Sequence, residues 1–399
     1  MSFLEKLLDG VTVKWKPLGE FTDYEQPTKY LVKSNNYNDN FPTPVLTAGK
    51  TFILGYTDET NGIYKASENP VIIFDDFTTA NKWVDFDFKA KSSAMKMITS
   101  SDESKASLKY IYYWMNTLPN DLVDGDHKRQ WISNYSNKLI PIPCPENPKI
   151  SLEIQQKIVD ILDKFTELTA ELTAELTARK QQYNYYREQL FIFDEKEVQH
   201  LPMEDESIGV FQRGKRFVKT DLISEGVPTI HYGEMYTHYG TWADKTKSFV
   251  CKELVESKNL RLAQKGDVVI VAAGETIEDI GLGTAWLGDE GVVIHDACFS
   301  YKTTLNPKFV AYFTRTKQFH DQIKKHISSG KISAINAKGL GKAIIPVPSP
   351  EEQERIVSIL DKFDTLTTSI NEGLPKEIEL RKKQYEYYRD LLLTFPKDN

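Results

Sequence analysis

Two glycine-containing segments have residues that could bind phosphate, but neither has the full spacing of a known motif. Ala48-Gly49-Lys50-Thr51 has the last residues of an ATP-binding loop, yet Pro44 stands where that motif needs glycine. Gly281-Leu282-Gly283 is followed by Trp286 at the position where a dinucleotide fingerprint needs its third glycine. We therefore interpret both segments as turns and expect neither ATP nor a dinucleotide to bind there.

Metal and methyl-transfer chemistry have no stronger support. His231 and His238 are seven residues apart without an HExxH motif, and Asp75-Asp76 lacks a further acid at nuclease-like spacing. The DPPY or NPPY tetrapeptide of amino-methyltransferases does not occur, and the three cysteines form no CxxC pair. We expect no catalytic residue, metal site or cofactor in this chain. Without a signal peptide or an apolar run of about 20 residues, a cytoplasmic location is expected.

The net charge of −7 at pH 7 conceals one strongly basic segment. Between Arg315 and Ile345 there are seven Lys or Arg residues and one Asp, which gives a local charge of +6. Because clustered cations hold polyanions, this segment indicates a localised nucleic-acid contact. A solvated helix face is an equally open interpretation.

Other side chains have the chemistry to contact DNA, since base reading needs forked donors and amides, and phosphate contact needs cations or hydroxyls. In the N-terminal part of the chain the candidates are Thr47, Lys50, Thr78, Thr79, Lys82, Lys91, Ser92, Lys128, Arg129 and Gln130. In the C-terminal part they are Tyr232, Glu234, His238, Tyr239, Glu275, Thr276, Ser328, Ser329, Lys331 and Lys338. For each one, DNA contact and an ordinary solvated role are both open.

The elements that must position these residues occur twice. Three blocks recur in one order at an offset of about 200 residues, which chance does not explain. The pairs are Ile140–Pro145 with Ile345–Pro350, Ile158–Phe165 with Ile356–Phe363, and Arg179–Arg187 with Arg381–Arg389. The chain is therefore expected to run globule, helix, globule, helix.

The two helices carry apolar residues at three- and four-residue steps. The first, from Ser151 to Phe193, would span about 64 Å at 1.5 Å per residue, which is too long for a small core. It is expected to pack against the second helix as a stalk. Gly373-Leu374-Pro375 interrupts the second stripe and predicts a break or kink there.

The globules have an α/β pattern. Buried strands are expected at Pro70–Phe74 and Asp267–Val271, and helices with aromatic core faces at Lys109–Trp114 and Lys308–Phe313. The expected domains are a first globule at 1–150, a central helix at 151–195, a second globule at 196–350 and a C-terminal helix at 351–399.

This duplicated arrangement resembles the specificity (S) subunit of type I restriction–modification systems. The resemblance covers essentially the whole chain and rests on the repeated Leu-Asp-Lys-Phe, Tyr-x-Tyr-Tyr-Arg and IPxPxP blocks. The segments Pro44–Lys50, Phe74–Thr78 and Lys91–Lys96 look like a target-recognition domain of that family. The tandem Thr169–Leu172 and Thr173–Leu176, each reading TAEL, resembles the spacer repeat of its type IC branch.

The resemblance implies two α/β target-recognition domains with pseudo-two-fold symmetry, separated by two long antiparallel coiled-coil helices. Each domain would read one word of a bipartite, asymmetric DNA site. The partners implied are double-stranded DNA, two methyltransferase (M) subunits and restriction (R) subunits, with no membrane. The chain itself would be non-catalytic, and S-adenosylmethionine, ATP and Mg²⁺ would bind in the partner subunits.

The TAEL repeat predicts how the unread gap between the words is set. Ala, Glu and Leu favour helix, so one unit should lengthen the helix by about 6 Å and rotate it by a net of about 40°. One base pair of DNA rotates by about 34–36°. We expect deletion of Thr169–Leu172 to shorten the gap by one base pair, the alternative being a merely stabilising repeat.

The tyrosine-rich helix ends leave two interpretations open. Tyr183, Tyr186, Arg187, Tyr385, Tyr388 and Arg389 either pack inside the stalk or present aromatic and arginine side chains to an M subunit. The leading function is a DNA-reading adaptor. The alternatives are a non-catalytic coiled-coil scaffold whose globules bind proteins, and a stand-alone nuclease or methyltransferase, for which the motifs are missing.

Overall fold

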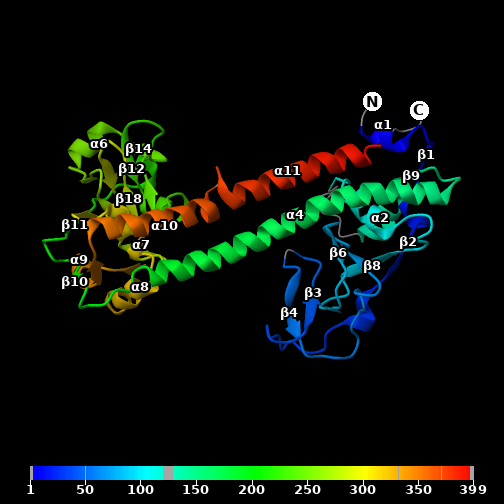
Figure 1. The fold of residues 1–399 in the computed structure, drawn as a ribbon, viewed down its shortest axis with the longest axis horizontal. Helices are drawn as coiled ribbons and strands as arrows, with labels where there is room; N and C mark the ends of the chain where they lie inside the picture. Colours follow the sequence, from blue (N-terminus) through cyan, green and yellow to red (C-terminus); the bar gives the residue numbers. More distant parts are fainter. Residues whose placement is uncertain (1–2, 50, 120–128, 331, 370, 396–399) are drawn as a thin grey trace. The chain divides into compact units, whose positions relative to one another are not determined.

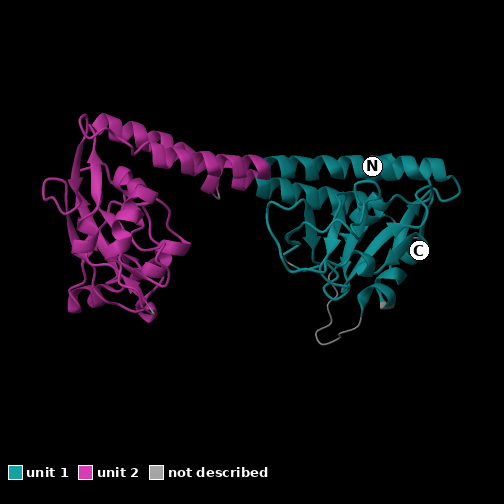
Figure 2. Cartoon of the chain, turned by 90° about the horizontal axis from the view of Figure 1, so that it is seen from below, with its two compact units in different colours: residues 1–172, 378–399 teal, residues 173–377 magenta. Residues whose placement is uncertain are grey.

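The computed structural model describes residues 3–49, 51–119, 129–330, 332–369 and 371–395. The chain divides into two compact units (Figure 2). Unit 1 combines two segments that are far apart in sequence, residues 1–172 and 378–399, and unit 2 is the continuous segment 173–377. The last part of the C-terminal helical region, from residue 378, thus belongs with the first globule. The candidates Lys50, Lys128 and Lys331 lie outside the described residues.

The strands of unit 1 pair mainly in the antiparallel sense, with one parallel pair between Thr43–Leu46 and Lys89–Ala90. Its main sheet has the order β2 (Thr22–Glu25), β8 (Met95–Ser100), β5 (Val71–Asp75), β6 (Asn81–Val84). A second sheet orders β4 (Ile53–Thr57), β3 (Thr43–Leu46) and β7 (Lys89–Ala90), and β1 (Val13–Pro17) pairs with β9 (Leu139–Pro143). The short helices are α1 (Phe3–Leu8), η1 (Leu18–Glu20), η2 (Pro27–Tyr30), α2 (Leu108–Met115), α3 (Gln130–Ser133) and η3 (Tyr135–Asn137).

Unit 2 has a larger set of strands. One sheet orders β11 (Gly209–Arg213), β20 (Cys298–Thr303), β16 (Val268–Val271), β18 (Gly283–Trp286) and β13 (Trp242–Ala243). Another orders β14 (Ser248–Val250), β12 (Val227–Ile230), β19 (Val292–Ile294) and β15 (Leu262–Ala263). The two-stranded pairs are β17 (Ala273–Gly274) with β21 (Ser333–Ala334), and β10 (Gln199–Pro202) with β22 (Ile344–Val347).

The helices of unit 2 complete a mixed helix-and-sheet fold, which confirms the expected class. They are η4 (Lys219–Asp221), α5 (Tyr232–Thr237), α6 (Lys252–Ser257), α7 (Pro307–Phe313), α8 (Lys317–Ile323), η5 (Lys324–His326), α9 (Ala337–Gly341) and α10 (Pro350–Thr368). The strands and helices expected at the cores of both globules are present as β5, β16, α2 and α7, each with the majority of its side chains buried.

Two long helical segments each have residues in both units. Helix α4 runs from Pro148 to Gln189, and the unit boundary falls within its TAEL repeat. Helix α10 begins with Ser349, whose hydroxyl accepts a hydrogen bond from the Glu352 N–H, and with Pro350 in its first turn. It ends at Thr368, and α11 (Gly373–Leu393) follows. Gly373 has φ +81°, and a Cβ there would lie 2.5 Å from the Thr365 carbonyl oxygen, so glycine is required at this interruption.

Each unit contains a seam between helices. In unit 1 the Phe165 ring of α4 stacks on Tyr388 of α11, with centroids 5.2 Å apart and planes 18° apart. In unit 2 the Tyr183 and Tyr186 rings of α4 stack on Phe363 of α10 at 6.1 and 5.6 Å. Aromatic residues of the repeated blocks therefore face one another across each seam.

A buried glutamine attaches each globule to its long helix in the same way. In unit 1 the Gln155 side-chain oxygen accepts the Ser107 N–H at 3.0 Å. Ser107 directly precedes α2, whose ribbon is labelled in Figure 1. In unit 2 the Gln353 oxygen accepts the Asn306 N–H at 2.8 Å, just before α7 begins. The repeat seen in the sequence is thus a repeat of contacts between globule and helix.

Candidate nucleic-acid interface

A strained turn between β5 and β6 presents side chains at one end of the unit 1 sheet. The Asp75 carboxylate accepts the N–H groups of Phe77 at 2.9 Å and Thr78 at 3.2 Å. Thr79 has φ +61°, a conformation that β-branched residues rarely adopt. Phe77 at the tip is 46% exposed. Strain of this kind persists only where the surroundings enforce it, and it concentrates at functional sites.

Asp76 joins this turn to another candidate segment. Its carboxylate accepts the Trp131 N–H at 2.9 Å, and its carbonyl oxygen accepts the Gln130 N–H at 2.9 Å. The Trp131 ring is buried against Phe74 at 5.2 Å. The structure therefore brings together Thr78 and Thr79 with Arg129 and Gln130, which are some 50 residues away in sequence. We call this group the turn cluster.

Lys82 lies next to the turn cluster, and three other candidates form a separate group. Lys82 in β6 pairs with Ile73 and lines a hollow of about 320 Å³ together with Thr79. At the ends of β3 and β7, the Lys91 N–H binds the Leu46 carbonyl, which places Lys91 and Ser92 near Thr47. The Lys91 ammonium donates to Asn35 Oδ1 at 2.5 Å and lies 5.6 Å from the Tyr37 ring centroid.

In unit 2 the candidates around α5 are used largely inside the protein. Glu234 is buried, and its carboxylate accepts hydrogen bonds from the His231 N–H and the Ser248 hydroxyl. The Tyr239 hydroxyl is held by the Lys247 N–H at 2.9 Å. These contacts give Glu234 and Tyr239 structural roles. His238 remains exposed.

Two histidines next to α5, the buried His295 and the half-buried His231, do not supply charge for a phosphate contact. The rings of His231 and His295 lie 4.7 Å apart, and Tyr232 packs on both. Burial lowers the pKa of His231 and of His295, so both are neutral at pH 7. Burial also raises the pKa of the Cys298 thiol to about 12, which makes this cysteine unreactive.

The remaining unit 2 candidates lie around the β17–β21 pair. Gly274 pairs with Ser333 directly before Glu275 and Thr276, and the Thr276 hydroxyl donates to Asp279. The Ser328 N–H binds the Ala334 carbonyl at 2.8 Å, which closes the turn that carries Ser329. Lys338 in α9 lines a separate hollow of about 380 Å³.

Two residues of the basic segment from Arg315 to Ile345 are engaged by neighbouring groups. The Arg315 guanidinium donates to the carbonyl oxygens of Gly240 at 2.9 Å and Gly283 at 3.0 Å. Lys317 forms an exposed ion pair with Asp321, four residues further along the chain. For the segment as a whole, the polyanion contact stays a prediction.

The tyrosine-rich helix ends are divided between the seams and the surface. Tyr183 is buried in its seam, and burial raises its pKa to about 12. The Arg187 guanidinium lies 5.3 Å from the Tyr183 ring centroid. Tyr385 lies 6.4 Å from the Tyr113 ring, and the Arg389 guanidinium donates to Asp390 at 2.7 Å. For Tyr183, Tyr385 and Tyr388, the structure favours packing within the protein, whereas Tyr186 stacks on Phe363 and is still 39% exposed.

Two tyrosines outside the predicted set are the most exposed of this group. Tyr185 is 61% exposed and Tyr387 is 64% exposed. They occupy the same position of the repeated Tyr-x-Tyr-Tyr-Arg block. Their recurrence could have drawn attention to them, but only the helix packing distinguishes the outward tyrosine from its neighbours.

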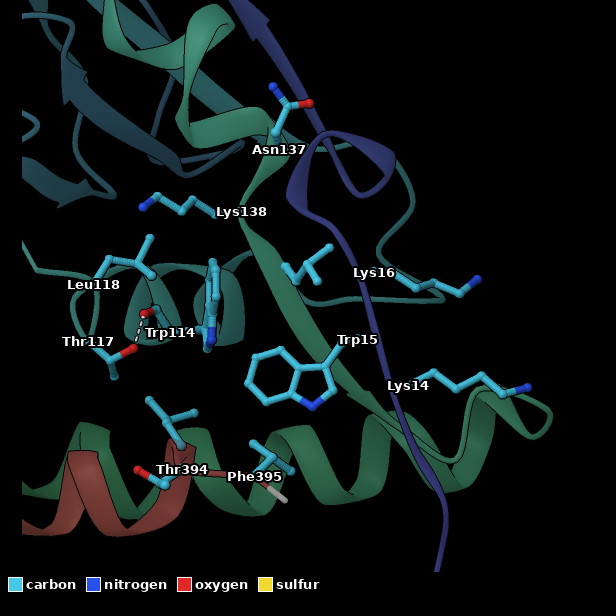
Figure 3. A pocket seen from close by; sticks show the side chains of 12 residues that line it. Lys14, Trp15, Lys16, Trp114, Thr117, Leu118, Asn137, Lys138, Thr394 and Phe395 are labelled. Carbon is cyan, nitrogen blue, oxygen red and sulfur yellow. Dashed lines mark hydrogen bonds between the residues drawn. The ribbon is translucent and has the colours of Figure 1, made fainter. Parts of the chain in front are cut away.

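Unit 1 also contains a mixed apolar and basic pocket of about 1040 Å³ (Figure 3). Trp15 and Trp114 line it, and the ammonium groups of Lys14 and Lys16 point away from it. Leu393 at the end of α11, with Thr394 and Phe395 that follow it, forms another wall. Within the described residues, no group of three or more potential metal ligands occurs. Likewise, none of the described helices is long and apolar enough to span a bilayer.

Comparisons with known proteins agree across the whole chain. A family model described as "Type I restriction modification DNA specificity domain" matches residues 11–179 and 205–380. The EcoR124I/EcoR124II specificity subunit of Escherichia coli is 54% identical over 404 residues, covering 100% of this chain and 98% of the relative. A putative type I specificity subunit of Haemophilus influenzae, S.HindORF215P, is 30% identical, with 99% and 98% covered.

Solved structures show a similar fold. The crystal structure of a type I restriction–modification S subunit from M. genitalium has a TM-score of 0.56 at 16% identity, with 98% of each chain covered. A chain from a study of complex assembly and conformational transition of the type I restriction–modification system has a TM-score of 0.59 at 16% identity, covering 96% of this chain and 98% of that one.

Proposed function

This chain belongs to the type I restriction–modification DNA specificity family, and from that premise we propose that it reads a bipartite, asymmetric DNA site with one word per unit. As a specificity subunit it recognises DNA sequence and is not itself an enzyme, since catalysis lies in partner subunits. Family membership also decides against the protein-binding scaffold.

The observation that carries this proposal is the combination of like attachments and unlike surfaces. Gln155 and Gln353 make equivalent contacts between globule and helix. The surfaces that contain the candidates differ, because unit 1 presents the turn cluster and unit 2 presents the β17–β21 pair. Two different surfaces on equivalent supports fit a reader of two different words, and pseudo-symmetric supports fit the local two-fold symmetry of duplex DNA.

The helix through the TAEL repeat supports a fixed separation between the words. Helix α4 is continuous from Pro148 to Gln189, so Thr169–Leu176 is helical throughout. A helix transmits both length and rotation, and four residues add a net rotation of about 40°, close to one base pair. We assign to this helix the role of setting the number of unread base pairs.

Partner docking is the second part of the proposal. Two M subunits would contact the outward faces of the long helices, with the exposed Tyr185 and Tyr387 as equivalent anchors. Exposed tyrosines are common energetic centres of protein interfaces. R subunits join the same complex, and S-adenosylmethionine, ATP and Mg²⁺ are needed by these partners.

Methylation mapping tests the proposal directly. The chain would be co-expressed with its M subunit in a host without other adenine methylation, and modified adenines would be mapped across the genome. We expect two short words with a constant unread gap. A single contiguous word, or methylation without sequence preference, would overturn the proposal. A host that expresses the M subunit without this chain controls for methylation that does not depend on this chain.

A further inference from the structure

A buried lysine lies behind the turn cluster of unit 1. The Lys96 side chain is 1% exposed, and its ammonium lies 3.7 Å from the carboxylate of Asp76, which is 3% exposed. Removing two charges from water costs more than their attraction returns unless further contacts compensate. A buried pair at this place is therefore better explained by what it holds in position than by its contribution to stability.

Asp76 is the side of the pair that fixes the backbone. It accepts the N–H groups of Gln130 and Trp131, one through its carbonyl and one through its carboxylate. Both bonds hold the first residues of α3, and Arg129 directly precedes them. The pair thereby sets where the Arg129 backbone lies relative to the turn between β5 and β6.

Lys96 is the member of the pair whose further contacts lead to residues at the surface. Its ammonium lies 4.8 Å from the Tyr24 ring centroid. With the Gln26 amide oxygen turned toward the two cations, that oxygen accepts from Lys96 Nζ at 3.2 Å and from Arg129 Nη1 at 2.9 Å. Gln26 and Arg129 are both exposed. A chain of contacts thus leads from a buried ion pair to an exposed guanidinium.

We propose that Gln26, Lys96 and Asp76 are positioning residues that aim the Arg129 guanidinium at a guanine in the DNA word read by unit 1. This inference rests on the proposed function. The arginine fork matches the O6 and N7 acceptors that guanine presents in the major groove. A neutral amide holds one nitrogen of the fork without cancelling its charge, and an arginine held in place loses less side-chain entropy on binding.

The corresponding strand pair of unit 2 is built differently. In unit 1, Phe74 of β5 pairs with Lys96 of β8. In unit 2, Val271 of β16 pairs with Cys298 of β20, and both side chains are buried. The positioning device therefore belongs to unit 1, so disturbing it must change one word and leave the other word unchanged.

The test uses the full chain in complex with its M subunit, acting on a duplex library randomised at both words. Arg129→Ala is expected to relax the preference for guanine at one position of one word by tenfold or more. Gln26→Leu, which removes the amide oxygen at an exposed site, is expected to relax the same position by a smaller factor. Gln26→Glu keeps an acceptor oxygen but adds a negative charge beside Arg129, so it is expected to keep guanine at that position and to weaken binding of all duplexes alike. The other word serves as the internal control in every variant.

Three other outcomes of this experiment would each contradict one step of the inference. If Arg129→Ala weakens all sequences equally, Arg129 contacts phosphate and the inference is wrong. If Gln26→Leu behaves as the unmodified chain while Arg129→Ala relaxes one position, the positioning role is wrong. If the unmodified chain shows no pair of words, the proposed function itself fails. Thermal melting of Gln26→Leu, expected to be unchanged, separates a positioning defect from unfolding.

Discussion

Tyr312 of α7 donates a hydrogen bond from its hydroxyl to the carboxylate of Asp361 in α10 at 2.7 Å. Lys308 contacts the same carboxylate at 2.7 Å. In unit 1 the Tyr113 hydroxyl donates to Asp163 of α4, and the Lys109 ammonium lies 3.4 Å from it. One aspartate per long helix thus holds a tyrosine and a lysine of its globule.

The Tyr312–Asp361 contact predicts a measurable loss of stability. Tyr312→Phe removes one hydrogen bond to a carboxylate that keeps its lysine, so the free energy of unfolding should fall by about 1.5–3 kcal/mol. Differential scanning calorimetry would measure the change. Tyr185→Phe, at an exposed site, is the matched control and should alter stability by less than about 0.5 kcal/mol. Equal effects of the two substitutions would contradict the role of this contact.

The lowered pKa of His231 and of His295 predicts that the folded protein loses stability in acid. Their pKa is lowered in the folded protein relative to the ordinary value of 6.5, so the unfolded chain binds more protons below that pH. Stability is therefore fully present above about pH 6.5 and is lost as pH falls toward the folded-state pKa. Melting temperatures measured from pH 7.5 to 5 should fall less steeply for His231→Gln than for the unmodified chain. The exposed His238→Gln should keep the original slope.

Deletion of one TAEL unit predicts a shorter gap. Removing Thr169–Leu172 should move the two words closer by one base pair and leave both words unchanged, because a rotation of about 40° corresponds to one base-pair step. Methylation sequencing with the M subunit would measure the gap. Thr169→Ala, which keeps the length of the helix, is the control. An unchanged gap in the deletion variant would limit the repeat to a stabilising role.

The position of Lys91 predicts a DNA contact that does not depend on the base sequence. Its ammonium lies beside Asn35 and Tyr37 at the ends of β3 and β7, where a cation suits a phosphate. Lys91→Ala should weaken binding of all duplexes alike and lower the slope of log K against log salt by about 1. Titrations at several salt concentrations would measure this slope. A changed preference at one base position would instead identify Lys91 as a base-reading residue.

The exposed tyrosines predict where the M subunits bind. Tyr185→Ala and Tyr387→Ala should each weaken M-subunit binding by about tenfold or more, as the loss of an interface anchor does. Isothermal titration with purified M subunit would measure both the affinity and the number of sites. Lys29→Ala, at an exposed site in unit 1, is the control. Unchanged affinity in both tyrosine variants would place the docking surface elsewhere.

The duplicated plan, the long helices and the core strands could be predicted from the amino-acid sequence alone. Helix periodicity, the repeated blocks and buried runs such as Val71–Phe74 are local patterns, and local patterns set which element forms. The family could be recognised for the same reason, because the repeated blocks that carry the resemblance are contiguous in the sequence. The sequence could not distinguish DNA-contacting residues from other polar residues, because exposed and buried polar side chains look alike in a sequence.

Which of these residues come into contact depends on the tertiary structure. Contacts between distant segments placed Arg129 beside the turn between β5 and β6, buried Glu234 and turned Arg315 toward backbone carbonyls. They also grouped the end of α11 with the first globule, although the chain orders it last. Which face of an element is covered depends on the partner that packs against it, and no local pattern contains that information.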